Sequence, residues 1–505
     1  MNRAAAIGIS IWSVLNGATR TDVIDPGTKY QAIDNFGASD CWSMQKIGAW
    51  SEKSKRCVAD LLFSTEKGIG LSCWRFNLGG GINPRLLGDT WRMPETFEVA
   101  EGRYDWSRQA NERWFLRAAK ARGVRQFVAF VNSPPARMTR NGLTHCDPGP
   151  HSTNLKSGHE KQFARYLVDV LKHFRDHPDP AERIAFDRVS PVNEPGWEWD
   201  GGPQEGNRAG LDDIKAIVKA LHAELARQKV KTRILVPEAR SPSIMYRRAR
   251  RQNRDAPERI GDYLRELCGD PEIGPMLSGT ICYHSYGADR FETQLVQHRR
   301  HLGRALWRYP GWKLWQTEYC VMRGPHGEGG RPRDLGIDTA LNVARVIHYD
   351  LTLAGASAWQ WWLAASRHNY KDGLVYTDHR KPGDSETIYE SKLLWALGNF
   401  SRFIRPGMRR IELTGDGHDK SGLLGSAYLD PRTGRIAAVY INMGEQPKGI
   451  RLRILGRKDA ATPAQRLTAY VTSDKPGEDL KRYPDVSLGD PYLVPARAVV
   501  TLVVE

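Results

Sequence analysis

Short apolar segments that have the character of buried strands alternate with amphipathic segments along most of this 505-residue chain. Eight strands are predicted, at 35–40, 71–79, 125–133, 186–195, 233–238, 277–286, 312–319 and 356–363. The seven linkers between them have helical character, as at 107–122, 160–174, 211–228 and 338–353, and a last helical segment follows at 390–404. Repeated β-then-α units imply a parallel sheet, and eight of them imply an α/β fold of the closed (β/α)8 (TIM barrel) type.

The pattern changes after residue 402. Segments 439–442, 450–454, 466–472 and 498–504 are alternating or β-branched runs separated by Gly, Pro and Asp. They predict an antiparallel β-sandwich side domain over 403–505, beside a catalytic barrel over 19–402. Residues 19–31, ahead of the first barrel strand, are a candidate extra strand of that β domain.

The first eighteen residues have two interpretations. A basic start, an apolar run over 4–15 and small residues near Ala18 resemble a secretory signal peptide, whereas a short terminal helix is the alternative. We favour the signal peptide, which predicts a secreted or periplasmic protein. The longest apolar stretch is too short to cross a bilayer as a helix, so no membrane association is expected.

The formal net charge of +16 raises the question of a nucleic-acid partner, but no nucleic-acid motif accompanies it. Arginine is spread along the whole chain, and the densest cluster, 246–251, is interpreted as a solvated loop rather than a specific anion site. An acidic polysaccharide is the expected partner if that cluster has a function.

Seven cysteines, an odd and small number, do not form a disulfide framework. Cys41, Cys73, Cys282 and Cys320 lie near predicted strand ends and are expected to be buried thiols. No Cys-x-x-Cys pair or histidine cluster is present, and no strand-end cluster is expected to supply three metal ligands. We therefore expect neither a metal nor another cofactor.

Polar and aromatic residues gather at the carboxyl ends of the predicted strands, which is the edge where a barrel builds its active site. In strand order they are Ser39, Asp40 and Trp42; Arg75 and Asn77; Asn132; Asn193 and Glu194; Glu238; His284 and Tyr286; Glu318; and Trp361. A barrel with only a structural role does not need such a set, so the pattern favours an enzyme.

Two glutamates of this set, Glu194 and Glu318, end strands 4 and 7, which face each other across a barrel mouth. Hydrolysis of a glycosidic bond needs two carboxyl groups in different protonation states, and a retaining double displacement needs them about 5–5.5 Å apart. Glu238 is a rival for either role, but strand 5 is expected to be poorly placed to share a site with both partners.

The surrounding motifs make a resemblance specific. They are 30–39 (YQAIDNFGAS), 70–77 (GLSCWRFN), 132–135 (NSPP), 191–195 (PVNEP), 316–319 (QTEY) and 359–362 (WQWW). As an ordered set over residues 30–400, they resemble glycoside hydrolase family 30, most closely its endo-β-1,6-galactanase-like branch. Asn35 stands where many members carry glycine, a departure that bears on subfamily and substrate.

The resemblance implies that Glu194 is the general acid/base and Glu318 the nucleophile. Glu194 must then hold a proton near neutral pH, which desolvation and a nearby Glu318 would favour, and Glu318 must stay ionised. By their matching positions, Arg75 and Tyr286 are the expected donors to Glu318. Asn193 is expected to bind the sugar 2-hydroxyl. Trp361, which matches a strand 8 tryptophan, is expected to form the floor of the subsite for the reacting sugar.

Three further residues have open interpretations. His284 either contacts substrate or is hydrogen-bonded inside the barrel mouth, Asn132 either touches sugar or braces the Pro134-Pro135 turn, and Trp42 is a sugar platform or a packing residue. The preferred function is a secreted retaining hydrolase of β-linked polysaccharide or oligosaccharide, with β-1,6-galactan as substrate. The alternatives are β-1,6-glucan, glucuronoxylan or a β-glucoside, or a carbohydrate-binding barrel without catalysis.

Overall fold

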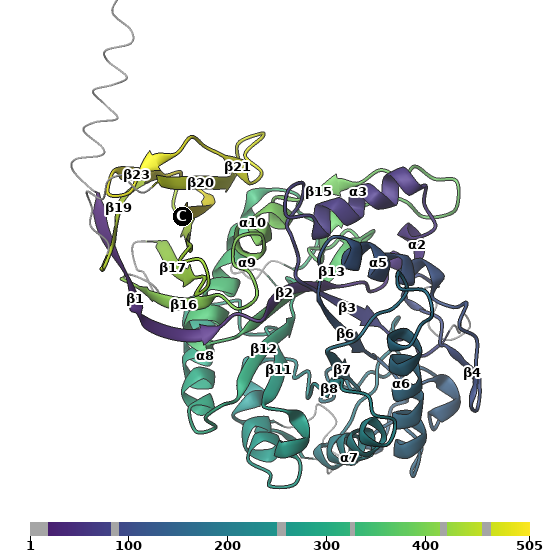
Figure 1. Ribbon diagram of the computed structural model, residues 1–505. Coiled ribbons are helices and arrows are strands. Elements are labelled where there is room, and N and C mark those ends of the chain that lie inside the picture. Colours follow the sequence, from purple (N-terminus) through teal and green to yellow (C-terminus); the bar gives the residue numbers. More distant parts are fainter. Residues whose placement is uncertain (1–18, 82–89, 250–258, 324–328, 415–421, 457–465) are drawn as a thin grey trace, which may run out of the picture.

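The computed structural model describes residues 19–81, 90–249, 259–323, 329–414, 422–456 and 466–505, and these form two large sheets (Figure 1). The candidate signal peptide over 1–18 lies outside the described residues, as do residues 250 and 251 of the arginine cluster. No helix within the described ranges is long and apolar enough to cross a membrane.

The first sheet contains eight parallel strands in barrel order, and each overlaps a predicted strand. They are β2 (Asn35–Ser39), β3 (Cys73–Asn77), β6 (Gln126–Phe130), β7 (Arg188–Ser190), β8 (Arg233–Ile234), β11 (Thr280–His284), β12 (Lys313–Glu318) and β13 (Ala358–Ser366). Between β8 and β11, the bridge from Ala239 to Tyr283 and the hydrogen bond from Cys282 N–H to the Val236 carbonyl (3.1 Å) close the ring. The predicted α/β barrel fold is confirmed.

Helices cover the outside of this ring (Figure 1). The long ones are α3 (Glu52–Phe63), α5 (Ala110–Ala121), α6 (Glu160–Arg175), α7 (Leu211–Arg227), α8 (Glu292–Leu306), α9 (Ile337–Tyr349) and α10 (Lys392–Ser401). In α6, Phe163, Leu167, Val170 and Phe174 recur at helical spacing and are buried toward the strands.

The connection between β8 and β11 differs from the predicted helical linker. Its described residues, 235–249 and 259–279, form the short turns η3 (Pro242–Met245), η4 (Leu264–Cys268) and η5 (Gly274–Leu277) and the hairpin β9 (Arg248–Ala249) with β10 (Ile260–Gly261). Pro242, Gly269 and Pro275 interrupt any longer helix, because proline lacks the amide donor and glycine favours a helix end.

Short elements complete the barrel domain. They are α2 (Met44–Ile47), η1 (Thr90–Arg92), β4 (Glu98–Ala100), β5 (Arg103–Tyr104), η2 (Ala136–Met138), η6 (Asp350–Ala354), β14 (Gly373–Tyr376) and β15 (Tyr389–Glu390). Strands β14 and β15 extend the barrel sheet beside β13. They place residues 367–372 next to the mouth, where β13 ends.

The barrel interior is filled below the mouth. One layer consists of Cys73, Val128, Leu235, Cys282, Trp315 and Ala358. The Asn35 amide bridges Gln126 and Gln360 through two hydrogen bonds of 2.8 Å, so this departure from the family pattern forms a polar bridge inside the barrel. The first inward residue above this packing on β3 is Arg75, because strand side chains alternate with a period of two. All seven cysteines are free, and the four expected to be buried are buried.

The second sheet is antiparallel except where β1 (Arg20–Ala32) runs parallel to β19. Its other strands are β16 (Arg409–Leu413), β17 (Leu423–Leu429), β18 (Ile436–Asn442), β19 (Lys448–Ile454), β20 (Arg466–Ser473), β21 (Lys481–Arg482), β22 (Val486–Ser487), β23 (Pro491–Val494) and β24 (Ala498–Val504). The sheet folds over a separate apolar core that includes Ile24, Leu452 and Leu502. Strand β1 thus joins the first residues of the described chain to its last domain (Figure 1).

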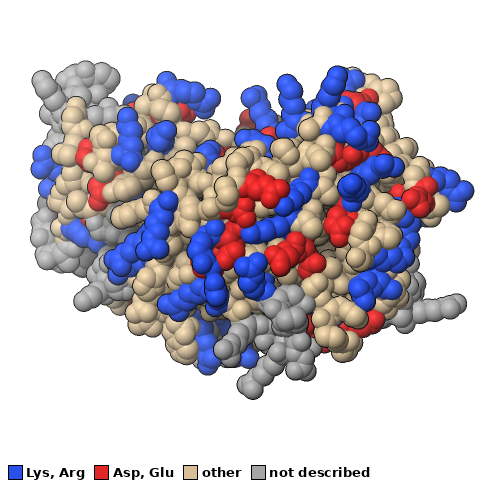
Figure 2. Space-filling model, turned by 90° about the horizontal axis from the view of Figure 1, so that it is seen from below, with Lys and Arg blue, Asp and Glu red and all other residues tan. Residues whose placement is uncertain are grey.

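Basic side chains are spread over the face seen in Figure 2, with acidic side chains among them. Arg248 and Arg247 of the predicted cluster lie on or next to β9, and the Arg247 guanidinium stacks on the Tyr246 ring at 5.2 Å. Mixing of both signs is typical of a solvated surface.

Asn399 of α10 connects the barrel domain to the second sheet. Its side-chain amide donates to the Tyr470 carbonyl and to the Thr501 hydroxyl, both at 3.0 Å, and the Thr501 hydroxyl donates to the Asn399 carbonyl (2.6 Å). The residue is fully buried. Two strands of the side domain are thereby fixed to the last helix of the barrel.

We expect Asn399→Ala to lower the free energy of unfolding by about 1–3 kcal/mol, because it leaves buried acceptors without their donor. The measurement is urea unfolding followed by circular dichroism. The control is Gln294→Ala on the exposed face of α8, for which less than about 0.5 kcal/mol is expected. An equal effect of both variants would show that the connection contributes nothing to stability.

Candidate active site

Two buried carboxylates meet at the mouth of the barrel. Glu318 is the last residue of β12, and Glu194 lies four residues beyond the end of β7. One oxygen of each, together with a ring nitrogen of His284, lies within 4.8 Å of the other two. This spacing is consistent with the separation of about 5–5.5 Å between the carboxyl groups of retaining glycosidases.

The backbone at Glu194 is held in an unusual conformation. Its φ is 42°, in the left-handed region that non-glycine residues rarely adopt. The Glu194 N–H donates to the Glu238 carbonyl (3.1 Å), and the Glu194 carbonyl accepts from the Trp199 indole (3.1 Å). These bonds fix the direction of the side chain, in the way that strained residues at functional sites are stabilised by their surroundings.

Glu318 accepts from two donors, which are the two residues predicted for it. The Tyr286 hydroxyl lies 3.0 Å from its Oε1, and the Arg75 guanidinium lies 3.3 Å from its Oε2. Arg75 is fully buried and stacks on the Phe130 ring at 4.2 Å. Burial raises the pKa of the Glu318 carboxyl, although His284 and Arg75 oppose the shift. Glu318 is therefore a stronger base than an exposed carboxylate would be.

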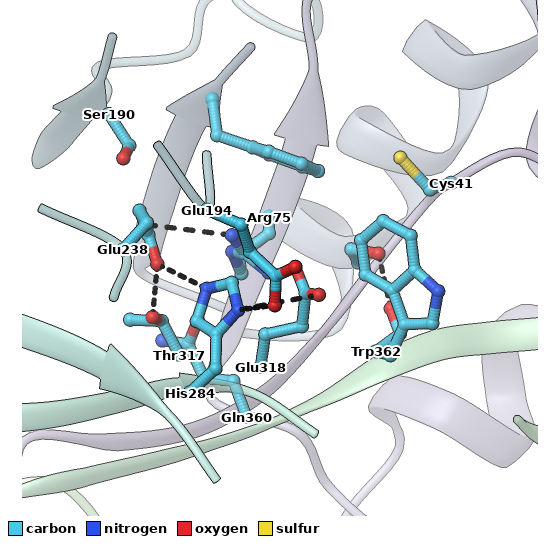
Figure 3. Close-up of polar contacts among 12 residues, drawn as sticks. Cys41, Arg75, Ser190, Glu194, Glu238, His284, Thr317, Glu318, Gln360 and Trp362 are labelled. Carbon is cyan, nitrogen blue, oxygen red and sulfur yellow. Dashed lines mark hydrogen bonds and ion pairs between the residues drawn. The ribbon is translucent and has the colours of Figure 1, made fainter. Parts of the chain in front are cut away.

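Glu238 belongs to the same network, and the prediction that strand 5 is poorly placed to share a site with the pair is wrong. Its Oε1 lies 3.5 Å from Arg75, and its Oε2 accepts from His284 (2.9 Å) and from the Thr317 hydroxyl (Figure 3). Glu238 has no exposed surface. The positive φ of 54° turns it back into the barrel after the short strand β8, a turn that the sequence pattern does not reveal.

His284 lies between the carboxylates. Of its two predicted roles, contact with substrate or hydrogen bonding inside the barrel mouth, the structure shows the second. Its Nδ1 is 2.9 Å from Glu194 Oε1 and its Nε2 is 2.9 Å from Glu238 Oε2, with no exposed surface left for substrate. Burial by itself would lower the pKa of His284. The charge of Glu318 and the bonds with the other two carboxylates raise it instead to about 10, so the ring is a cation at neutral pH.

The charges of Arg75 and His284 also keep the Glu238 carboxylate ionised. Burial would raise its pKa, but the Arg75 guanidinium and the His284 imidazolium lower it to about 2. Glu238 is therefore ionised at every pH at which the protein is expected to work. His284 and Arg75 lie between its carboxylate and the pair formed by Glu194 and Glu318 (Figure 3).

The tryptophan on the mouth is Trp362 rather than the predicted Trp361. Trp361 is fully buried, donates its indole N–H to the Asp372 carbonyl (2.8 Å) and packs against Tyr319. Trp362 is 9% exposed and stands beside the carboxylate pair, edge-on to Trp42 at 5.3 Å (Figure 3). On β13, Ala358 belongs to the interior layer and Gln360 bonds to Asn35 inside the barrel, so the alternation of strand side chains brings Trp362, and not Trp361, to the inner face.

The other predicted residues lie at the strand ends and present unpaired polar atoms. Asn132 and Asn193 are buried, and the side-chain oxygen of each has no partner among the described residues, although the Asn132 amide contacts the Cys41 sulfur at 3.8 Å. The Trp42 indole N–H is also unpaired. Buried polar atoms in native proteins are normally hydrogen-bonded, so these atoms require water or ligand hydroxyls.

Further buried acceptors extend this group. Asp40 and Asn77 belong to the strand-end set expected from the sequence, whereas Glu205 lies outside that set. The oxygens concerned are Asp40 Oδ2, Asn77 Oδ1 and Glu205 Oε2, none of which has a hydrogen-bond partner within the described part of the chain. Burial raises the pKa of Glu205 well above its usual range, while the Gly80 N–H donates to its other oxygen (2.7 Å). A Cβ at Gly80 would meet the Thr144 side chain at 2.8 Å, so only glycine allows this close approach. The run Gly79-Gly80-Gly81 after β3 was the available signal.

Comparisons with known proteins agree with this geometry. The family model described as O-glycosyl hydrolase family 30 matches residues 19–376. The chain belongs to O-glycosyl hydrolase family 30. This family shares the retaining mechanism, and the resemblance inferred from the sequence motifs is confirmed.

Three known proteins are similar to the chain at different levels. An endo-β-1,6-galactanase of Hypocrea rufa is 26% identical over 44% of this chain and 50% of its own length. The glucuronoxylanase XynC of Bacillus subtilis is 24% identical over 39% and 40%. The chain thus spans half or less of the curated relatives that it matches. The crystal structure of a conserved exported protein from Bacteroides fragilis is 30% identical, with a TM-score of 0.84 over 96% of this chain and all of the other.

The arrangement of Glu194, His284 and Glu318 is close enough for a metal ion, contrary to the expectation that no strand-end cluster would offer three such groups. We do not assign them as ligands. Both ring nitrogens of His284 point at carboxylates, and a protonated ring has no lone pair for a metal. Arg75 already provides a cation to Glu318.

The two tryptophans of β13 give a test of the assignment. We expect Trp361→Ala to lower the free energy of unfolding by about 3–5 kcal/mol, because it leaves an enclosed cavity. Trp362→Ala opens onto the mouth, so it is expected to cost less stability but to lower kcat/KM at least tenfold, or about 1.4 kcal/mol. The measurements are urea unfolding and hydrolysis per mole of folded protein. If Trp361→Ala lowered kcat/KM more, and Trp362→Ala lowered the free energy of unfolding more, Trp361 would be the tryptophan of the site.

Proposed function

We propose that the chain is a secreted retaining glycoside hydrolase, with Glu194 as general acid/base and Glu318 as nucleophile. The observation that carries the assignment is the unequal bonding of the two carboxylates. Both oxygens of Glu318 accept from Tyr286 or Arg75, which favours the ionised form that a nucleophile needs. No hydrogen bond from the described residues reaches Glu194 Oε2, which leaves that oxygen available to a leaving group.

The reaction follows from this geometry. A Glu318 oxygen attacks the anomeric carbon while Glu194 gives its proton to the glycosidic oxygen, so the C–O bond to the leaving sugar breaks and a glycosyl ester forms. Glu194 then takes a proton from water, whose oxygen attacks the same carbon and releases Glu318. Two inversions give net retention of configuration.

The surrounding residues have roles in binding the reacting sugar. Asn193, next to the acid, bonds the sugar 2-hydroxyl in this proposal; its side-chain oxygen, which has no partner among the described residues, supports that role, and such a contact strengthens toward the transition state. Trp362 supplies the apolar floor for the C–H face of the ring, with Trp42 behind it. Asn132 offers another unpaired acceptor to the substrate.

The proposed substrate is β-1,6-galactan, as in arabinogalactan side chains, which the similarity to the Hypocrea rufa galactanase supports. Secretion is supported by the exported Bacteroides fragilis protein of the same fold and suits an enzyme acting on a polymer. Glucuronoxylan is the second candidate. The glucuronoxylanase relative favours it, as does the Arg92 guanidinium 5.5 Å from the Trp42 ring, since an arginine beside a sugar platform suits an acidic side group.

Azide rescue tests the two catalytic roles. We expect Glu318→Ala to lose at least about 10⁴-fold in kcat, because the covalent step is lost, and azide to restore turnover with a glycosyl azide of inverted configuration. With Glu194→Ala, azide should attack the glycosyl ester and give a product of retained configuration. NMR of the two products is the measurement. Unimpaired hydrolysis by the Glu318 variant, or the same configuration from both, would contradict the assignment.

Product analysis tests the substrate. We expect the wild-type protein to release oligosaccharides from β-1,6-galactan, with slower or no release from glucuronoxylan and β-1,6-glucan. Chromatographic sizing of products over time is the measurement, and Glu318→Ala is the control for contaminating activity. Faster cleavage of glucuronoxylan would move the substrate to the second candidate. Binding of polymer without any release would support a barrel that binds carbohydrate and does not cleave it.

A further inference from the structure

Glu238 is connected to the proposed acid/base by two separate routes. Its main-chain carbonyl accepts from the Glu194 N–H (3.1 Å), and its side chain reaches Glu194 through His284. Glu238 itself is fixed on all sides: Arg75 and Thr317 bond its carboxylate, and its N–H lies 3.3 Å from the Cys282 sulfur. A carboxylate held this firmly and fully buried cannot reach a substrate.

The bridging ring has a fixed pattern of donors. A protonated imidazole has two N–H donors and no acceptor. His284 therefore donates through Nε2 to Glu238 and through Nδ1 to Glu194 Oε1. An oxygen that accepts this bond cannot carry the acidic proton in the same direction, so the proton of Glu194 belongs on Oε2, toward the mouth.

We propose that Glu238 is a positioning residue for the acid/base step: through His284, it determines which oxygen of Glu194 carries the transferable proton. The inference rests on the proposed function for the role of Glu194. It assigns to Glu238 a part in proton transfer without contact to substrate. Loss of its charge would free His284 to become neutral or to turn, and Glu194 would lose its defined orientation.

The charges that face His284 support this arrangement. They come from Glu194 after β7, Glu238 after β8 and Glu318 at the end of β12, with Arg75 from β3 bonded to the last two. While Glu194 holds its proton, two cations face two anions and the buried site is neutral. When the proton leaves, the new carboxylate lies beside the His284 cation, which stabilises it for its second role as a base.

The test uses Glu238→Gln, which keeps the shape and removes the charge. The first readout is the histidine ring, followed by ¹⁵N NMR of histidine-labelled protein. In the wild type, His284 should stay doubly protonated until the pH approaches its pKa of about 10. In the variant, its pKa should fall, because a partner of the cation is lost. An unchanged titration would overturn the proposal, and this readout requires no turnover.

The second readout is the dependence on the leaving group, using aryl β-galactosides. We expect Glu238→Gln to lower kcat/KM about 100-fold for the phenyl glycoside, which needs a proton, and less than about fivefold for the 2,4-dinitrophenyl glycoside, which does not. Glu238→Asp, which restores the charge, should recover part of the loss. An equal loss on both substrates would mean that Glu238 acts only on the fold, and the proposal would fail.

Two controls keep these outcomes separate. Glu98→Gln removes another buried carboxylate bonded to an arginine, Arg137, without contact to His284, and should leave the leaving-group dependence unchanged. If Glu238→Gln does not fold, His284→Gln breaks the same bridge and should show the same selective loss on the phenyl glycoside. If the wild type cleaves no aryl β-galactoside, the proposed substrate fails. The NMR titration still tests whether the charge of Glu238 keeps His284 protonated.

Discussion

The buried guanidinium of Arg75 is the interaction on which the rest of the site depends. A charge with no exposed surface is tolerated only with charged partners and good geometry, since removal of one partner from a buried pair costs about 3–5 kcal/mol. Arg75 has two partners, Glu238 and Glu318, from strands on different sides of the ring. It therefore holds together the carboxylate proposed to attack the sugar and the carboxylate proposed to orient the acid.

This dependence explains why a third glutamate is present in a reaction that needs two. Two carboxylates with Arg75 and a charged His284 would leave the mouth positive when the acid is protonated. Glu238 removes that excess and, through its carbonyl, also holds the backbone of Glu194. Glu238 therefore both balances the charge of the site and orients Glu194. The stability of the buried charges and the proposed chemistry depend on the same residue.

The sequence predicted the barrel well because its evidence is periodic: buried strands and amphipathic helices leave a pattern along the chain. It also predicted Glu194, Glu318, Arg75 and Tyr286 as neighbours, because parallel strands bring their carboxyl ends to one edge. Prediction from the sequence failed where the direction of a side chain depends on the conformation of the folded backbone. The left-handed turn at Glu238 changes the direction of its side chain without changing the apolar pattern. Strand β13 is buried on both faces and carries tryptophans on both, so its composition does not mark Trp362 as the inward one.

Strand β1 has a consequence for how the chain reaches this structure. It lies between β16 and β19, and its residue Val23 bonds to Thr414, 391 positions later. During synthesis the first strand emerges with an unpaired edge and must wait for partners made near the end, so contact order is high and folding is expected to be slow and exposed to aggregation. A barrel excised at residue 402 would leave β1 without either neighbour, with both rows of its amide groups open to other chains.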